Sequence, residues 1–177
     1  MLTVAVVVEG EYDAVVFREL LPKCRAGVKV IARQCSGPVT GKCSGIVLEL
    51  ERRKLAKGIF VICDADGEPP KERVAAISKR LPAKDGKIHI QPIVIVQKME
   101  ALLLADEQAL KTIGVIAKFP RPEKILDPKH KLRSVLSRIN RLYTQEVARE
   151  IAVAARVEVI AERCPSFEPL RSAILAL

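Results

Sequence analysis

Aromatic side chains are scarce in this chain, which has no tryptophan, two tyrosines and four phenylalanines. A protein that binds single-stranded nucleic acid by stacking its bases needs a platform of aromatic rings. The composition therefore disfavours base stacking. Any contact with nucleic acid should go mainly to the phosphates.

Cysteine and histidine patterns typical of metal or redox sites are also lacking. The five cysteines include no Cys-x-x-Cys pair, and only two histidines, His89 and His130, are present. These numbers disfavour a structural zinc site and a disulfide framework. We expect free thiols, most of them buried.

Long hydrophobic runs are missing as well. The first apolar run, Val4 to Val8, is short, follows no basic segment and is followed by acids, so it does not match a secretory signal. No later stretch is long enough to cross a membrane. We therefore expect a cytoplasmic protein with no membrane partner, and the sequence leaves the oligomeric state open.

The chain has 177 residues, 49% of them hydrophobic, which is enough to form one domain with its own core. Its first two thirds alternate short β-branched runs with helical patterns, as is typical of a parallel sheet covered by helices. Pro22 is expected to end the first helix. The predicted strands are 3–8, 28–32, 59–63 and 88–96, and the predicted helices are 12–21, 42–57, 70–81 and 99–111.

The C-terminal third has a different pattern. Beyond Gly114 no further strand is predicted, prolines punctuate residues 120–128, and apolar residues then recur at helical spacing. We therefore expect residues 1–112 to form an α/β core and residues 113–177 to form a helical cap of the same compact domain.

Acidic residues stand at the ends of the predicted strands. Glu9 follows the first strand, Asp64 and Asp66 follow the third, and Glu100 lies just beyond the fourth. The carboxyl ends of parallel strands meet at one edge of a sheet, where ligands bind. Four carboxylates brought together repel one another unless a cation compensates, and their oxygens suit Mg²⁺ or Mn²⁺. The sequence therefore predicts a divalent-metal site in which these four acids are the ligands and the catalytic groups.

Other charged residues near this edge are secondary candidates. Lys42 and Lys98 lie close to the predicted edge, where Lys98 would hold a phosphate or offset the acids. Asp13 stands in the first turn of the first helix. Asp106 is expected in the middle of a helix, on a different face from Glu100, as a solvated or capping residue. Acids after strands are also ordinary helix caps, and this alternative stays open for each of the acids.

Five short motifs follow one another along the chain, at residues 8–13, 64–67, 100–106, 127–132 and 164–167. Together they resemble the pattern VEGxTE, DxDG, EAWLLAD, DPKxxL and CPSF of a group of small stand-alone bacterial Toprim-like proteins. Here the motifs read VEGEYD, DADG, EALLLAD, DPKHKL and CPSF, so Tyr12-Asp13 stands where the group has Thr-Glu, and Leu102 replaces an aromatic residue.

The resemblance implies a Toprim-like, Rossmann-like fold related to the Toprim domains of overcoming-lysogenization-defect nucleases. In Toprim domains a glutamate after one strand and an Asp-x-Asp after a later strand bind Mg²⁺. The corresponding residues in this chain are Glu9, Asp64 and Asp66.

The positive charge is concentrated in one stretch. The chain carries a net charge of +9, and residues 111–141 hold nine basic and two acidic side chains, an excess of seven. A basic segment of this kind suits the phosphates of nucleic acid. We predict that it binds nucleic acid, with DNA favoured over RNA, through Lys129, Lys131 and Arg133.

The leading hypothesis for function is a Mg²⁺-dependent nuclease or other phosphodiester-processing enzyme. Asp64, Asp66 and Glu100 would hold the metal, and Glu9 would bind metal or act as general base. Two alternatives stay open. One is a non-catalytic module that binds nucleic acid or protein, and the other is a receiver-like phosphoacceptor domain, against which the second aspartate of the pair and Glu100 both argue.

Overall fold

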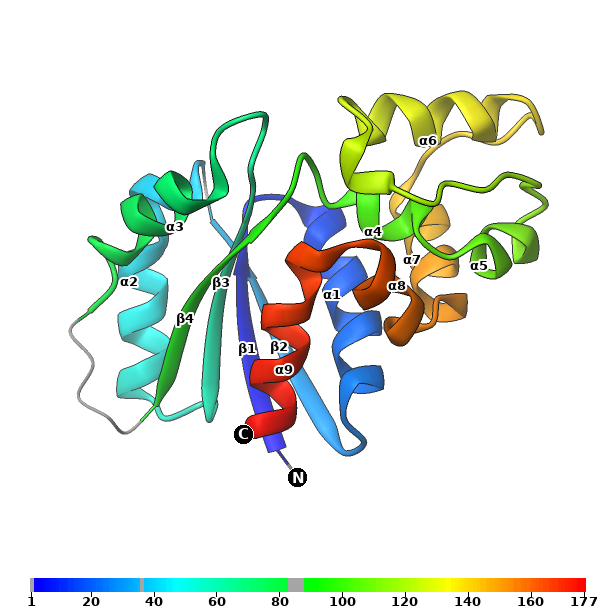
Figure 1. Cartoon of the computed structure of the whole chain (residues 1–177). Helices are drawn as coiled ribbons and strands as arrows, with labels where there is room; N and C mark the ends of the chain where they lie inside the picture. The colour runs from blue at the N-terminus through cyan, green and yellow to red at the C-terminus, as the bar shows by residue number, and fades with distance from the viewer. Residues whose placement is uncertain (1, 36, 83–87) are drawn as a thin grey trace.

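In the computed structural model, residues 2–35, 37–82 and 88–177 are described. Within these ranges the chain forms a four-stranded parallel sheet with helices on both faces (Figure 1). The spatial order of its strands is β2-β1-β3-β4. The predicted α/β architecture is therefore confirmed. The strands are β1 (Leu2–Val8), β2 (Val28–Gln34), β3 (Gly58–Asp64) and β4 (His89–Ile95).

The apolar composition of β1 and β3 suits their central position in the sheet. β1 and β3 are almost continuous runs of apolar, mainly β-branched residues, and nearly all of their side chains are buried. Such runs suit strands that are covered on both faces. β1 pairs with β2 starting at Leu2 and Val28, and with β3 starting at Val4 and Gly58. Because all pairs are parallel, the carboxyl ends of the strands share one edge.

The helices divide into two layers. α2 and α3 cover one face of the sheet, whereas α1 and the C-terminal helices cover the other (Figure 1). The helices are α1 (Glu11–Cys24), α2 (Val39–Arg52), α3 (Pro70–Ser78), α4 (Glu100–Leu104), α5 (Glu107–Thr112), α6 (Pro128–Ser137), α7 (Gln145–Ala154), α8 (Val157–Arg163) and α9 (Glu168–Ala176), with 3₁₀ turns η1 (Pro122–Lys124) and η2 (Pro165–Phe167).

The predicted end of the first helix was wrong. α1 continues through Pro22 to Cys24, since a proline in the last turn removes only one backbone hydrogen bond. Leu20, Leu21 and Cys24 are buried in the core, and this packing outweighs the loss. Tertiary contacts here override local propensity.

Other helix boundaries also differ from those predicted. α2 was expected at 42–57 but ends at Arg52, because Lys54 adopts a left-handed backbone with φ of 49° that ends the helix. The single helix expected at 99–111 is two helices, α4 and α5. Asp106 interrupts it with an extended backbone and caps α5, its side chain accepting from the backbone N–H of Gln108.

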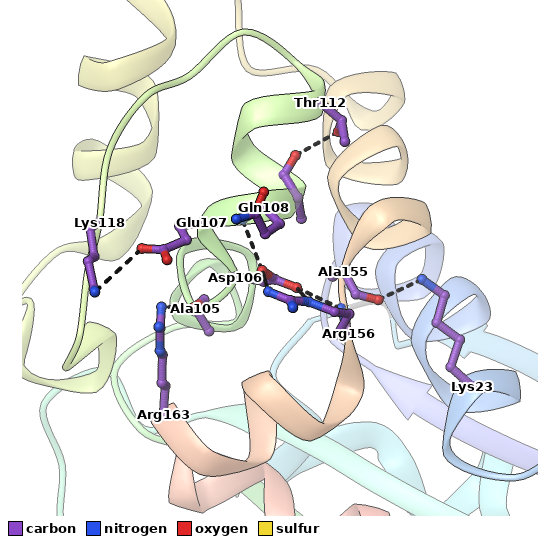
Figure 2. A network of polar contacts seen from close by, with 11 residues as sticks. Lys23, Ala105, Asp106, Glu107, Gln108, Thr112, Lys118, Ala155, Arg156 and Arg163 are labelled. Atoms are coloured by element: carbon purple, nitrogen blue, oxygen red, sulfur yellow. Dashed lines mark hydrogen bonds and ion pairs between the residues drawn. The ribbon is translucent and has the colours of Figure 1, made fainter.

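Asp106 also anchors the C-terminal helices (Figure 2). The side chain is 0% exposed and accepts hydrogen bonds from the backbone N–H of Gln108 at 3.0 Å and from that of Arg156 at 2.9 Å. The guanidinium of Arg156 donates two further bonds at 2.8 and 2.7 Å. Burial alone raises the pKa of Asp106, but the bonds from Arg156 outweigh it and lower the value to about 2.

Lys23 and Arg163 add two more connections (Figure 2). The ammonium of Lys23, on α1, donates to the carbonyl oxygens of Ala152 and Ala155 at the end of α7, at 2.7 and 2.8 Å. A cation at a helix C-terminus also interacts favourably with the helix dipole. Arg163 donates to the carbonyl oxygen of Ala105 at 2.8 Å. α7 and α8 are thereby held against α1 and against the break between α4 and α5.

All five cysteines are free and buried, as predicted. No helix in the described ranges is long and apolar enough to cross a membrane.

Candidate functional site

A pocket of about 270 Å³ lies at the carboxyl edge of the sheet. Residues from the ends of β1, β3 and β4 and from the starts of α1, α4 and α6 line it. Four of them are carboxylates and two are lysines. The lining residues are Glu9, Gly10, Tyr12, Asp13, Asp64, Lys98, Glu100 and Lys129.

Backbone hydrogen bonds hold two of the carboxylates in place. Asp13 accepts from the backbone N–H of Gly10 at 3.0 Å, which closes the first turn of α1. Asp64, the last residue of β3, accepts from the backbone N–H of Met99 at 2.9 Å. This bond links the carboxyl end of β3 to the segment in which Glu100 begins α4.

The pocket crowds negative charge into a poorly solvated space. Burial raises the pKa of Asp13 to about 6, and the charges of Glu100 and Glu9 add to this against the bond from Gly10. Burial likewise raises the pKa of Asp64 to about 8, and Asp13 and Glu100 contribute further. Both carboxyls therefore bind protons more tightly than in water, as expected where positive charge is in deficit.

Two lysines supply part of the missing positive charge. The Lys129 ammonium lies 3.8 Å from Oε1 of Glu100 and 5.6 Å from the ring centroid of Tyr12. Lys98 also lines the pocket, and its ammonium lies 3.4 Å from Oδ1 of Asp127 at the start of α6. Both cations stand at the pocket, where they are placed to contact an anionic ligand.

The lining residues suit a divalent metal in kind, though their side chains do not form a ready-made cage. Carboxylate oxygens are the hard ligands that Mg²⁺ and Mn²⁺ prefer. In the part of the chain that the structure describes, no group of three or more His, Cys, Asp or Glu side chains has a metal-holding arrangement. Of the predicted ligands, Glu9, Asp64 and Glu100 share the pocket, and metal binding by them stays a prediction.

The fourth predicted ligand, Asp66, is not among the residues that line the pocket. It adopts a left-handed backbone with φ of 49°, and Gly67 follows with φ of 81°. The turn places the carboxylate 3.5 Å from the guanidinium of Arg73 on α3. Asp66 still contributes to the raised pKa of Asp64, so it stands at the margin of the pocket.

The secondary candidates separate into two groups. Asp13 and Lys98 line the pocket, whereas Lys42 and Asp106 are not among its lining residues. Lys42 lies beside Gly37 near the start of α2. Asp106 is neither mid-helical nor solvated, because it caps α5 and is bonded to Arg156; of the two roles expected for it, capping is confirmed.

The three residues predicted to bind nucleic acid all belong to α6, but they do not share one face. Lys129 and Arg133 are one helical turn apart, which puts them on the same side of the helix. Lys131 points elsewhere, with its ammonium 5.6 Å from the ring centroid of Phe119. Arg133 is exposed. Their contact with nucleic acid stays a prediction.

Sequence reasoning missed the tyrosines. Tyr12 lines the pocket, and the ring of Tyr143 lies against it with centroids 5.0 Å apart. Tyr143 comes from the loop between α6 and α7, which local pattern does not connect to the acids. The sequence offers one signal for these residues, because the chain has only two tyrosines and both lie at this pocket.

The CPSF motif has a structural role. Ser166 accepts from the backbone N–H of Val96 at 3.1 Å, and its hydroxyl and backbone N–H both donate to Glu123 of η1. Cys164 donates to the carbonyl oxygen of Ala101. Phe167 is fully buried. The motif therefore fastens η2 to the end of β4 and to α4.

Two solved structures are similar to this chain. One is a hypothetical protein from Pyrococcus horikoshii OT3, with 16% identity and a TM-score of 0.57 over 99% of this chain and 100% of that chain. The other is the C-terminal region of the Xanthomonas campestris pv. campestris OLD protein, with 15% identity and a TM-score of 0.47 over 98% of this chain and 96% of that chain. The first likeness shows the fold, and the lower TM-score of the second does not establish a common fold.

Comparison with curated proteins found no match. The family model described as a domain of unknown function, DUF4276, matches residues 8–175, which is nearly the whole chain. The chain belongs to the DUF4276 family.

Proposed function

We propose that this protein is a Toprim-type, metal-dependent nuclease or a related phosphodiester-processing enzyme. The observation that carries the proposal is the pocket at the carboxyl edge of the sheet, in which four carboxylates face two lysines. Acids that bind metal and cations that bind phosphate are the two kinds of group that phosphodiester hydrolysis requires.

The crowded carboxylates support a cationic ligand. Buried like charges are unfavourable, and the pKa of Asp64, raised to about 8 first by burial and then by its acidic neighbours, reflects that cost. A bound divalent cation would relieve it. Asp64, Glu100 and Glu9 would hold the ion, which would polarise a scissile phosphate and lower the pKa of a bound water.

The remaining pocket residues have roles of their own. Lys98 and Lys129 are placed to bind the non-bridging oxygens of a phosphate and to orient it against the acids. Asp13 adds charge and steadies the turn that carries Glu9. Asp66, paired with Arg73, contributes charge from the margin of the pocket.

Nucleic acid is the proposed substrate because the basic stretch meets the acidic pocket. Lys129 belongs to the segment with an excess of seven positive charges and also lies 3.8 Å from Glu100. A phosphate backbone bound along α6 would thus pass the pocket. DNA is the first substrate to test, with RNA beside it.

The direct test compares two isosteric changes. Glu100→Gln removes a buried pocket carboxylate, whereas Glu162→Gln removes an exposed one on α8. With single- and double-stranded DNA and RNA in Mg²⁺ or Mn²⁺, we expect cleavage by the parent and by Glu162→Gln, and a loss of at least about 100-fold in Glu100→Gln. Cleavage that persists at the parental rate in Glu100→Gln would contradict the proposal.

One observation favours a second candidate, a non-catalytic module that binds nucleic acid or protein. The described acids form no ready-made metal cage, so the pocket lacks the preorganisation typical of many catalytic sites. On this alternative, Mg²⁺ would change binding or stability without any cleavage. Exposure to a small phosphodonor distinguishes a receiver-like phosphoacceptor from both candidates, because only the phosphoacceptor would then carry phosphate on Asp64.

A further inference from the structure

A second groove, of about 230 Å³, lies between residues 114–117 and the end of α6. In Figure 1 the segment between α5 and α6 lies on the opposite side of the molecule from α2 and α3. Lys129 lines the acidic pocket and Arg138 lines this groove, and the two are about 14 Å apart along the helix axis. The groove is therefore separate from the acidic pocket.

The groove offers apolar contact at the surface. Val115 and Val135 are buried beside it, whereas the neighbouring Ile116 is 90% exposed. Among the described residues, the exposed large hydrophobic side chains all belong to the segment 113–177; they are Ile116, Leu126, Leu142, Val153 and Leu175. A single exposed apolar residue is ordinary, but one that adjoins an apolar groove marks a surface suited to binding.

Positive charge without a partner borders the same groove. Arg138 is exposed and makes no ion pair or hydrogen bond with any residue that the structure describes. The same holds for Lys111 near the end of α5. Lys118 has Glu107 at 3.9 Å and is itself 65% exposed. A ligand that complements this surface should therefore carry negative charge as well as apolar groups.

The backbone beside the groove can pair with an extended chain. Residues 116–118 belong to no helix or strand, and their N–H groups and carbonyl oxygens make no hydrogen bond with any other described residue. Extended peptides bind proteins through such exposed backbone groups, while alternate side chains enter pockets. The groove is also smaller than the roughly 300–1,000 Å³ typical of pockets that enclose a small molecule. These features favour a peptide as the ligand.

We propose that this groove binds an acidic peptide segment of a partner protein, anchored by an aliphatic side chain. The anchor occupies the groove, carboxylates of the partner contact Arg138 and Lys111, and its backbone pairs with residues 116–118. A second copy of this chain fits less well, because each copy carries a net charge of +9. Nucleic acid also fits less well, since the lining includes no aromatic ring for base stacking. The inference does not rest on the proposed function.

Selection from a phage-displayed library of random linear peptides tests the proposal. The selection is run in EDTA, so that no metal site is required. We expect the parent protein to enrich peptides that combine aspartate or glutamate with leucine, isoleucine or valine. These peptides should not bind the double variant with Ile116→Ser and Arg138→Glu. A selection that yields no peptide able to distinguish the parent from this variant would overturn the proposal.

Single variants locate the binding surface. Measured by fluorescence anisotropy, Ile116→Ser and Arg138→Glu should each weaken binding of an enriched peptide by about tenfold or more. The controls Leu126→Ser and Lys124→Glu make the same changes at exposed residues outside the groove lining, and should keep the parental affinity. Because all four side chains are exposed, the fold should tolerate these changes. Equal losses in variants and controls would exclude the groove as the binding site.

Two further measurements address other occupants of the groove. Ile116→Ser leaves the charge unchanged, so we expect it to bind DNA and RNA as the parent does. A loss of nucleic-acid binding as large as the loss of peptide binding would overturn the assignment to a protein partner. A dimer of the parent that Ile116→Ser dissociates in sedimentation would assign the groove to a second copy instead. Nucleic-acid cleavage bears only on the proposed function.

Discussion

Asp106 is a buried carboxylate and Asp64 a partly buried one, and their environments are opposite. Asp106 accepts four hydrogen bonds, three of them from Arg156, and its pKa is lowered to about 2 despite the effect of burial. Asp64 accepts one described hydrogen bond, from Met99, and burial among other acids raises its pKa to about 8. The charge of Asp106 is balanced by Arg156, whereas Asp64 lies among acids without enough positive charge nearby.

This contrast separates structure from function within one chain. A buried charge with a matched partner connects parts of the fold. A cluster of partly buried like charges, open to a pocket, is a cost that folding alone does not explain. Asp106 therefore belongs to the attachment of the C-terminal helices, and Asp64 to the site that we propose binds a cation.

The largest expected effect on stability is the loss of the Asp106 anchor. Asp106→Ala removes a helix cap and the charge-assisted bonds to Arg156, and should lower the free energy of unfolding by about 3 kcal/mol. The melting temperature should fall by roughly 10 °C. The control Glu150→Ala breaks a half-exposed pair with Arg141, at 2.9 Å, and should cost under about 1 kcal/mol. Equal losses in the two variants would refute the contrast between anchor and surface pair.

Low pH should remove the stabilisation that Asp106 provides. Because folding lowers the pKa of Asp106 from 3.8 to about 2, the unfolded chain binds the proton more tightly than the folded protein. The stabilisation is therefore fully present above pH 3.8 and is lost as pH falls through about 2. We expect the difference in unfolding free energy between the parent and Asp106→Asn to shrink over that window in chemical denaturation. A difference that stays constant down to pH 2 would contradict the assignment.

Asp64→Asn should have the opposite effect on folding stability in the absence of metal. The amide oxygen can still accept from Met99, and the folded protein no longer holds a carboxyl whose pKa is raised to about 8, so stability near neutral pH should rise on the order of 1 kcal/mol. The thermal shift caused by Mn²⁺ should be lost. The control Asp127→Asn changes a carboxylate outside the pocket lining and should keep that shift. A parental Mn²⁺ response in Asp64→Asn would exclude this residue as a ligand.

The smallest expected effects are on nucleic-acid binding by residues on the two sides of α6. In metal-free buffer, Lys129→Ala with Arg133→Ala should flatten the salt dependence of nucleic-acid binding by about 0.7 to 0.9 per lost phosphate contact. Lys131→Ala should flatten this salt dependence by no more than the amount for one phosphate contact, because the Lys131 ammonium also lies over the ring of Phe119. Binding curves for DNA and RNA over a range of salt measure both. Unaltered slopes in all three changes would remove α6 from the binding surface.

The sheet and most of the acidic pocket were predictable from sequence, because both follow from simple geometry. Apolar runs such as Val4 to Val8 specify buried strands, and parallel strands bring their carboxyl ends to one edge. That rule correctly brought Glu9, Asp64 and Glu100 to a single pocket. It needs no knowledge of side-chain orientation.

What sequence reasoning missed depends on orientation and on distant contacts. Asp66 turns to the margin because two successive residues adopt left-handed backbones and Arg73 attracts its charge. Asp106 interrupts a continuous helical pattern because Arg156, far along the chain, completes its bonding. Tyr143 reaches Tyr12 at the pocket only through the packing of the C-terminal helices. None of these contacts leaves a periodic signal in the sequence.

Crystallography of Mn²⁺-soaked protein tests the central claim most directly, because the anomalous signal locates the ion without any choice of substrate. We predict a Mn²⁺ peak in the pocket, bound by oxygens of Asp64 and of Glu9 or Glu100, and its loss in crystals of Asp64→Asn. Soaked crystals of the parent with the pocket carboxylates well ordered and no Mn²⁺ among them would contradict the account.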